Sequence, residues 1–566
     1  MAAEGTPTNG PTPSERHAIG ISFGNSNSSI AYTTIEDKAE VIANEDGDRQ
    51  IPSILSYVAG EEYTGQQAKA QLIRNSKNTV AYFRDYLGQD FKSIDPTHSH
   101  ASAHPEAHGD TVAFKIHDKE GEEESTVTIS EVATRHFRRL IQSASDYTGK
   151  QVNSAVITIP TNFSEKQKAA LTKAATDAGL EVLQLIHEPT AAILAYDARP
   201  ESKISDKIVV VADLGGTRSD VAVVASRGGM YTILATAHDY DTAGVHLDKV
   251  LQDHFAKEFI KWNTTDPREN ARSLAKLKLE AEATKRALSI GTNANFSVES
   301  LAEGADFSST INRLRYETIA RKVFDGFNRL IEGVVKKAGL DVLDIDEVIL
   351  SGGTSHTPKI ASNMANIFPS TTTILAPSTT PSAINPAELQ ARGAALQASL
   401  IQEYEKEDID QSTHAAVTTV KHLSNAIGVL AITEDVSKGV FTPIISAETA
   451  MPARRTIHIN APKEGGDVLI KVVEGGSSIK VSKAEPKPKA DSEKDGSDDD
   501  SDDESDEEPE EIREKVWKVG NVLAEAAIKG VKKGGKVEVM LNVAGDASVT
   551  LTCREVGGKG GVRGAF

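Results

Sequence analysis

Four glycine-rich turns are the first candidates for chemistry in this sequence, because each follows an apolar, β-type run. They are GISFGNSNSS from Gly20, DLGGTRSD from Asp213, DTAGVHLD over 241–248 and SGGTSHTPK from Ser351. A single turn of this kind is usually plain turn geometry. Four together favour a phosphate site, because glycines let many backbone N–H groups surround an anion whose charge is spread over several oxygens.

A polar helix face is the second candidate. Asp266, Pro267 and Glu269 predict the start of a long helix, and Gly291 predicts its end after about Ile290. The residues that share one face of it, at spacings of three and four, are Glu282, Lys285, Arg286 and Ser289. Such a face is most often a solvated surface. Beside a phosphate site it becomes a candidate nucleoside contact.

The elements that would position these residues alternate between β-type and helical patterns. The apolar runs are AIGISF from Ala18, SAVITI over 154–159, KIVVVADL over 207–214 and EVILSGG over 347–353. This alternation predicts an α/β layer architecture. One helix is marked by Ser164 and Gln167, which have capping-box spacing, and by Gly179, which can end it.

Other segments differ from these in composition. Residues 1–16 hold prolines and glycines without an apolar cluster, which predicts disorder. The polar stretch 402–420 is interpreted as a linker. From 421 to 566, short β-type runs separated by Gly, Asp and Asn predict a small antiparallel β-domain. That domain is interrupted at 485–512 by a predicted disordered acidic loop, which is too charged to pack.

Composition narrows the function classes. The net charge is −20, but residues 491–511 hold 14 acids and one lysine, so the rest of the chain carries only −7. No run of Lys and Arg indicates a direct nucleic-acid site. Cys553 is the only cysteine, which excludes an intramolecular disulfide and favours a reducing compartment. The first residues have no apolar signal core, and no run reaches the ~18 apolar residues of a membrane span. We expect a cytosolic protein that does not enter membranes.

Two local patterns carry separate interpretations. Ser497, Ser501 and Ser505 each precede an acid by three residues, a context that suits an acidophilic kinase as well as an unmodified, solubilising loop. GVKKGGK over 530–536 matches part of a phosphate-loop pattern, but Val537 follows instead of Ser or Thr. Because no helix is predicted after it, we interpret the match as coincidence.

The glycine turns, with their order and spacing, resemble the 70-kDa heat-shock (DnaK-type) chaperones of the actin and sugar-kinase superfold. GISFGNSNSSIAY is similar to the first phosphate hairpin, DLGGTRSDVAVV to the second, and VILSGGTSHTPKI to the adenosine motif. The long segment from AVITIPTNF to EPTAAILAY is similar to the family's connecting segment. The resemblance implies an actin-like two-lobed nucleotide-binding domain over 17–401, followed by a small antiparallel β-sandwich.

The resemblance also implies a set of ligand contacts for ATP. The implied phosphate contacts are Gly24, Asn25, Ser26, Asn27, Gly215, Gly216, Thr217 and Gly244. The implied nucleoside contacts are Glu282, Lys285, Arg286 and Ser289 on the helix face, with Gly352, Gly353 and His356 opposite. Arg286 and His356 could stack on the purine. Asp213 and Glu188 match acidic positions that would hold Mg²⁺ through water.

Three positions depart from the family's hydrolytic site. Ser22 stands where the family has an aspartate, Arg84 where it has a lysine, and Arg218 where it has a small hydroxyl residue. Asn25 and Ser26 also replace paired threonines. Phosphoryl transfer needs charges that neutralise the transferring group and position water and metal. Because such groups act mostly in the transition state, we expect ATP to bind while its hydrolysis is absent or negligible.

The C-terminal half departs as well. The stretch 402–420 lacks the short leucine-rich acidic linker of family members, and after the last hairpin only GGKGGVRGAF remains. That leaves no length for a helical lid. A sandwich without a lid is better suited to holding one extended segment by strand pairing than to trapping clients. A β-domain that binds nothing is the alternative.

Together, these departures resemble atypical family members that serve as the chaperone-like subunit of the eukaryotic ribosome-associated complex. The resemblance implies a stable heterodimer with a zuotin-type J-protein and ribosome contact mostly through that partner. It further implies stimulation of a separate, active heat-shock chaperone during nascent-chain folding in the cytoplasm. Three alternatives stay open: an active client-binding chaperone ATPase, a sugar or small-molecule kinase, and a filament-forming actin relative.

Overall fold

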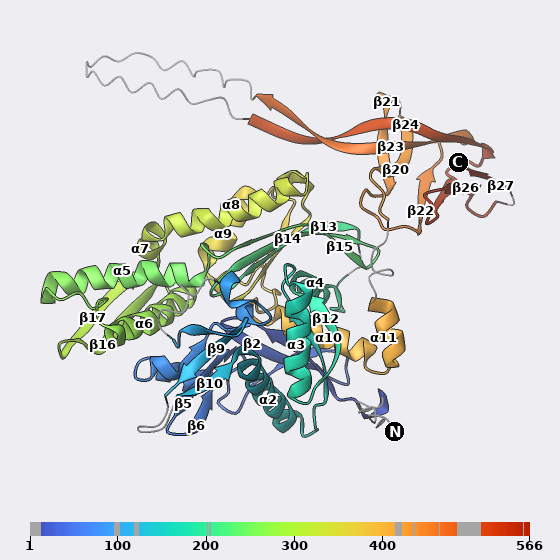
Figure 1. Cartoon of the computed structure of the whole chain (residues 1–566). Helices are drawn as coiled ribbons and strands as arrows, with labels where there is room; N and C mark the ends of the chain where they lie inside the picture. Colours follow the sequence, from blue (N-terminus) through green and yellow to red (C-terminus); the bar gives the residue numbers. More distant parts are fainter. Residues whose placement is uncertain are drawn as a thin grey trace, which may run out of the picture. The chain divides into compact units, whose positions relative to one another are not determined.

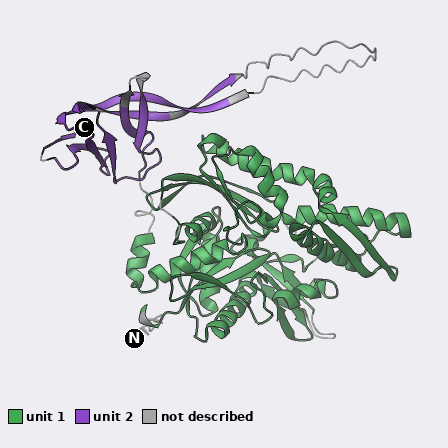
Figure 2. Ribbon diagram, turned by 180° about the vertical axis from the view of Figure 1, so that it is seen from behind, with its two compact units in different colours: residues 1–419 green, residues 420–566 purple. Residues whose placement is uncertain are grey.

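The computed structural model describes most of the chain. The described residues are 13–94, 102–117, 124–200, 202, 205–413, 421–433, 436–462, 464–483, 511–558 and 560–566. They divide into two compact units, residues 1–419 and 420–566, which are coloured separately in Figure 2. The predicted acidic loop, apart from its last two residues, and its three serines lie outside the described residues.

The first lobe of unit 1 is built on the sheet β12-β11-β1-β2-β3 (Figure 1). Its strands are β1 (Ala18–Phe23), β2 (Asn27–Thr33), β3 (Ala39–Ile42), β11 (Ser154–Ile159) and β12 (Glu181–His187). Side chains alternate between two apolar layers, as a pleated strand requires. Ile19 and Ile21 pack with helices α2 (Ile129–Thr148) and α3 (Glu165–Asp177), whereas Val156 packs toward α10 (Leu389–Ile401).

Smaller elements extend this lobe. Strands β5 (Ile54–Val58), β6 (Glu61–Thr64) and β7 (Thr79–Ala81) form one sheet, and β8 (Pro105–His108), β9 (Thr111–Ile116) and β10 (Ser125–Thr128) form another. The short strand β4 (Ile51–Pro52) pairs with β2, and helix α1 (Gly65–Gln71) follows β6.

The second lobe repeats the arrangement with the sheet β15-β14-β13-β18-β19. Its strands are β13 (Lys207–Leu214), β14 (Ser219–Arg227), β15 (Met230–Asp239), β18 (Glu347–Ser351) and β19 (Thr373–Leu375). One face packs against α5 (Gly244–Asn263), α8 (Arg321–Lys337) and α9 (Pro358–Ile367), and the other against α4 (Glu188–Asp197). An outer subdomain holds α6 (Ala271–Ile290), β16 (Asn293–Ala302), β17 (Ala305–Asn312) and α7 (Arg313–Ile319).

Each central strand therefore opens a hairpin, β1–β2 in the first lobe and β13–β14 in the second. Helices α4 and α10 lie between the two sheets. Their close contact depends on Gly393, where a Cβ would lie 1.9 Å from the Ala191 carbonyl oxygen. Gly20 does the same for β1, because its Cβ would lie 2.1 Å from the Ala395 nitrogen. The two-lobed α/β fold expected from the sequence is confirmed.

Unit 2 consists of two four-stranded antiparallel sheets, β21-β20-β23-β24 and β22-β25-β26-β27. The strands are β20 (Ala426–Thr433), β21 (Val436–Ile445), β22 (Ala453–Asn460), β23 (Gly466–Lys483), β24 (Glu511–Val531), β25 (Lys536–Val543), β26 (Val549–Glu555) and β27 (Gly561–Ala565). Residues such as Val472, Leu541 and Cys553 form the core between them. The described part of 421–566 contains no helix, and Gly530–Lys536 connects two strands instead of preceding a helix.

Four boundaries differ from the sequence-based expectation. Residues Pro13–Glu15 form a short 3-10 helix, and Arg16 is buried with its guanidinium paired to Glu181 at 2.7 Å. The predicted linker contains helix α11 (Lys406–Thr413), whose Ile409 is buried in unit 1. Strand β24 already begins at Glu511, inside the predicted loop.

The fourth difference concerns the long helix. α6 begins at Ala271 rather than near Asp266, because Asn270 accepts hydrogen bonds from the backbone of Arg272 and Ser273 and so caps it. The end at Ile290 and the Ser164–Gln167 capping box of α3 are as predicted. Among the helices that the structure describes, none is long and apolar enough to cross a membrane.

The contact at Gly393 gives a stability prediction. Gly393→Ala should destabilise unit 1 by about 2 kcal/mol, because backbone would have to move apart in a packed interface. The matched control is Gly333→Ala in the exposed part of α8, where nothing lies within 4 Å of the added Cβ. That variant should be neutral or slightly stabilising. Urea unfolding of both variants checks this, and equal midpoints would contradict the role given to Gly393.

Candidate functional site

The two phosphate hairpins face each other across the space between the lobes. Asn25 donates from Nδ2 to Thr217 Oγ1 at 2.9 Å, which joins the first hairpin to the second. A Cβ on Gly216 would lie 2.4 Å from Ser26 Oγ, so the backbone approaches closely there. Ser26 Oγ is buried and has no hydrogen-bond partner within the described residues. A buried hydroxyl without a partner is costly unless a ligand satisfies it.

The third glycine turn completes this cradle. The backbone nitrogens of Gly244 and Val245, at the start of α5, donate to the carbonyls of Gly215 and Gly216 at 3.0 and 2.8 Å. A Cβ on Gly244 would lie 2.6 Å from Thr354 Oγ1, so no larger residue fits between the turns. The structure thus brings the predicted phosphate residues Gly24, Asn25, Ser26, Asn27, Gly215, Gly216, Thr217 and Gly244 into neighbouring hairpins and turns.

The predicted nucleoside face lies on α6, and its side chains already have partners. Lys285 pairs with Asp248 at 2.7 Å and donates to the Gly244 carbonyl at 3.1 Å. Ser289 donates to its own helix, at the Lys285 carbonyl. Glu282 accepts from Arg286 on the same helix and from Lys69 of α1, in the other lobe, at 2.7 Å. The last contact joins the two lobes directly.

The adenosine motif approaches from the end of β18. Gly352 adopts a φ of +82°, and a Cβ there would lie 2.6 Å from Asp213 Oδ1, so only glycine fits. Gly353 begins the turn that carries His356, whose Nε2 lies 3.0 Å from Asn385 Oδ1. Burial lowers the pKa of His356, and the nearby charge of Arg286 acts in the same direction. The ring is therefore neutral at physiological pH.

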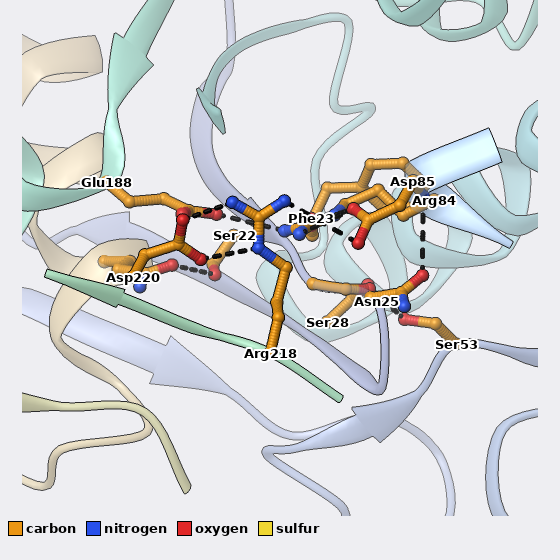
Figure 3. Close-up of polar contacts among 12 residues, drawn as sticks. Ser22, Phe23, Asn25, Ser28, Ser53, Arg84, Asp85, Glu188, Arg218 and Asp220 are labelled. Atoms are coloured by element: carbon orange, nitrogen blue, oxygen red, sulfur yellow. Dashed lines mark hydrogen bonds and ion pairs between the residues drawn. The ribbon is translucent and has the colours of Figure 1, made fainter. Parts of the chain in front are cut away.

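Arg84 is buried in the hydrolytic region, with only 5% of its side chain exposed. Its guanidinium contacts Glu188 Oε1 at 3.1 Å, Asp85 Oδ1 at 2.8 Å and the Phe23 carbonyl at 3.3 Å. Figure 3 shows these groups converging from separate segments. Glu188, at the start of α4, is thus ion-paired to the side chain that replaces the family's lysine.

Arg218 is equally buried and is held on several sides. Its guanidinium binds both carboxylate oxygens of Asp220, and it donates to Tyr240 Oη at 2.9 Å and Asn162 Oδ1 at 3.0 Å. It also lies 3.7 Å from Asp85 Oδ2. A planar donor in this position fills space that a small hydroxyl residue would leave open.

Ser22 is the third departure, and its hydroxyl has a protein partner. It lies 3.0 Å from Gln390 Oε1 of α10, and the amide of Gln390 lies 3.5 Å from Ser351 Oγ. A neutral hydroxyl bound to an amide cannot supply the charge of an aspartate. The end of β1 is therefore a structural contact with α10.

Three carboxylates could hold a metal ion. One oxygen from each of Glu188, Asp213 and Asp220 lies within 4.8 Å of the others. Burial raises the pKa of Glu188 and Asp213, and repulsion from the neighbouring carboxylates adds to the effect. Because Glu188 and Asp220 already bind arginines, the residues fit a Mg²⁺ ion held through water better than one bound directly.

Sequence reasoning missed five residues of this site: Lys69, Asp85, Asp220, Tyr240 and Gln390. Asp220 carries a readable signal, since it follows the predicted Arg218 at the i+2 spacing that puts both side chains on one face of a strand. Asp85 directly follows Arg84 in the sequence. Tyr240 and Gln390 have no such signal, because they reach the site only through the tertiary fold.

The comparisons with known proteins agree with this architecture. Residues 18–485 match the family described as Hsp70 protein. A relative named heat shock protein 70 homolog, from Schizosaccharomyces pombe, is 46% identical over 554 residues, which is 97% of this chain and 95% of that protein.

Two further relatives extend the comparison. The ribosome-associated complex subunit SSZ1 of Saccharomyces cerevisiae is 44% identical over 548 residues, covering 96% of this chain and 99% of its own length. Heat shock 70 kDa protein 14 of Homo sapiens is 32% identical over 462 residues, 81% of this chain and 87% of that protein. Similarity of this extent, together with the two-lobed fold and its glycine turns, establishes that the chain belongs to the Hsp70 family.

Proposed function

We propose that this chain is a non-hydrolysing, ATP-binding, chaperone-like subunit of a ribosome-associated complex. The observation that carries the proposal is the pair of buried arginines, Arg84 and Arg218, among the carboxylates of the hydrolytic region. Similarity to SSZ1 over nearly both full lengths supports the assembly. The Hsp70 family binds ATP with Mg²⁺ in general, and this chain keeps the turns that cradle phosphates.

Binding is supported by the parts of the site that remain available. Ser26 Oγ is a buried group without a protein partner, and the glycines at 216 and 244 leave room for no side chain between the turns. Bound Mg²⁺ would supply positive charge beside the phosphates. Asp213, with Glu188 and Asp220, would hold it through water.

Loss of hydrolysis is supported by how the remaining acids are used. Glu188 accepts from Arg84 and Asp220 from Arg218, so a buried guanidinium orients each acid and neutralises its charge. At position 22 a serine bonded to Gln390 replaces the carboxylate. The positions that would act in the transition state are therefore committed to protein contacts, while Ser26 Oγ beside the glycine turns has no protein partner among the described residues.

The partners are inferred from the similarity to SSZ1. We infer that a zuotin-type J-protein is the stable partner and that the ribosome is contacted mostly through it. The complex would stimulate a separate, active heat-shock chaperone in the cytoplasm, near nascent chains. The β-sandwich of unit 2 supports the role of holding an extended partner segment, since β24 pairs with no strand but β23 among the described residues and so leaves an edge at which a segment could add.

Hydrolysis is the first property to test. Purified protein with radiolabelled ATP should retain the nucleotide and form ADP at a negligible rate at most. The variant Ser22→Asp/Arg84→Lys/Arg218→Thr, which returns the family's residue types, should gain turnover on the order of a hundredfold over the wild type. Arg321→Thr, an exposed arginine on α8, is the control and should behave like the wild type. Multiple turnovers by the wild type, with release stimulated by peptide, would rule the proposal out.

The Lys69–Glu282 pair predicts slow nucleotide release. It joins α1 to α6, and its side chains are only 14% and 24% exposed. Lys69→Ala should release ATP roughly five- to tenfold faster in stopped-flow chase experiments, without creating turnover. Lys168→Ala removes a comparable pair, with Glu165, that lies within α3. If both variants released ATP at the same rate, the Lys69–Glu282 pair would have no role in nucleotide retention.

Assembly is tested by purification from cell lysate over a range of salt concentrations. The J-protein should stay bound at high salt, whereas ribosomes should leave as salt screens their charged contacts. Mass spectrometry and ribosomal RNA content measure the two. Recovery of the chain alone with free client peptides would favour the active-chaperone alternative.

A further inference from the structure

Side chains of the two lobes contact one another directly. Asp85 and Asn162 belong to the first lobe, and Arg218 and Tyr240 to the second. Tyr240 Oη donates to Asp85 Oδ2 at 3.1 Å, Arg218 donates to Asn162 Oδ1 at 3.0 Å, and Arg218 Nη1 lies 3.7 Å from Asp85 Oδ2. All three contacts lie beside the phosphate hairpins (Figure 3 labels Asp85 and Arg218).

We propose that Asp85, Asn162, Arg218 and Tyr240 form an interlobe latch that keeps the two lobes closed in the absence of nucleotide. The claim concerns the nucleotide-free chain and does not depend on ATP binding. It assigns a positioning role to Asp85 and Tyr240, which act on the lobes and not on a reacting group.

Each half of the latch is fixed within its own lobe before the lobes meet. In the second lobe, Asp220 binds the guanidinium of Arg218 with both oxygens, and the guanidinium carbon lies 5.1 Å from the centre of the Tyr240 ring. In the first lobe, Arg84 holds Asp85 at 2.8 Å. Such groups lose little conformational entropy when the latch closes, which makes their contacts more favourable than those of mobile surface pairs.

Opening the latch is costly because its charges are buried. The side chains of Arg218 and Asp85 are only 5% and 11% exposed. Burial alone would raise the pKa of Asp85, but Arg84 and Arg218 lower it, so the carboxylate is charged at physiological pH. Burial raises the pKa of Tyr240 to about 12, so its hydroxyl keeps the proton it donates. Parting the lobes would leave these groups without partners that they have in the closed state.

Two other contacts also join the lobes. Asn25 bonds Thr217 at 2.9 Å, and Lys69 bonds Glu282 at 2.7 Å. Several separate contacts resist rotation of the lobes better than a single contact would. The closed arrangement of the lobes is therefore the favoured state of the nucleotide-free chain.

Spin-label distance measurements test the latch in the nucleotide-free protein. Gln66→Cys in α1 and Asn295→Cys in β16 place labels at exposed positions in opposite lobes. The natural Cys553 is fully buried and is the only cysteine, so labelling is specific. The wild-type background should give one narrow distance population that ATP leaves unchanged. A broad population that narrows only with ATP would overturn the latch.

Variants identify the contact responsible. Tyr240→Phe removes one hydroxyl, and Asp85→Asn removes the shared charge. Each should raise the open population of the nucleotide-free protein roughly tenfold, and ATP should reverse the change. Tyr231→Phe is the matched control, because it also removes a hydrogen bond from a tyrosine to an aspartate, here to Asp197 at 2.8 Å. Tyr231 packs with α4 against the sheet of the second lobe, so this bond does not join the two lobes.

The outcomes are separable from those of ATP binding. If ATP fails to bind, the latch is still supported by closed nucleotide-free wild type and opened variants. If Tyr240→Phe and Asp85→Asn both leave the distances unchanged, the latch is wrong even where ATP binds tightly. Asp85→Asn also perturbs Arg84, so Tyr240→Phe, which keeps every charge, is the deciding variant.

Discussion

The pairing of two buried guanidiniums with buried carboxylates is the constraint on which the nucleotide region depends. A buried charge is tolerated only when it is paired and hydrogen-bonded. Arg84 and Arg218 satisfy this condition through Asp85, Glu188 and Asp220, which come from three different segments. The ends of β14 and α4 and the turn at 84–86 are therefore fixed relative to one another. Loss of Arg84 leaves Glu188 buried without its counter-charge, and loss of Arg218 does the same to Asp220.

The glycine turns and the acids of this region depend on different interactions. The backbone of the glycine turns depends on steric fit, which the arginines do not disturb, and Gly352 still has room for no side chain beside Asp213. The acids, by contrast, are the partners of the buried arginines. The glycine turns can therefore keep their conformation whatever residues surround the acids, because the two rely on different atoms of the same hairpins.

Local signals predicted the elements well where short-range chemistry decides them. The capping box of α3 and the glycine turns are examples. Prediction was less accurate where several nearby residues could cap the same helix, since Asn270 and not Asp266 marks the start of α6. It also missed helix α11 in the predicted linker, where Ile409 is buried. Contacts between residues far apart in the chain could not be predicted from the sequence. Asp85 and Tyr240 are 155 positions apart, and nothing local to either residue indicates that they meet.

The long hairpin of unit 2 has a mechanical consequence. β20 pairs with β23 only from Lys471 to Gly475, whereas β23 and β24 remain paired to Lys483 and Glu511. The outer portion is a two-stranded ribbon of eight residue pairs, Gly476–Lys483 with Glu511–Lys518, that runs for roughly 25 Å at about 3.3 Å per residue without further support from β20. A two-stranded ribbon bends and twists more easily than a sheet. Displacement of its outer end is therefore taken up within the ribbon before the strain reaches the core of the sandwich.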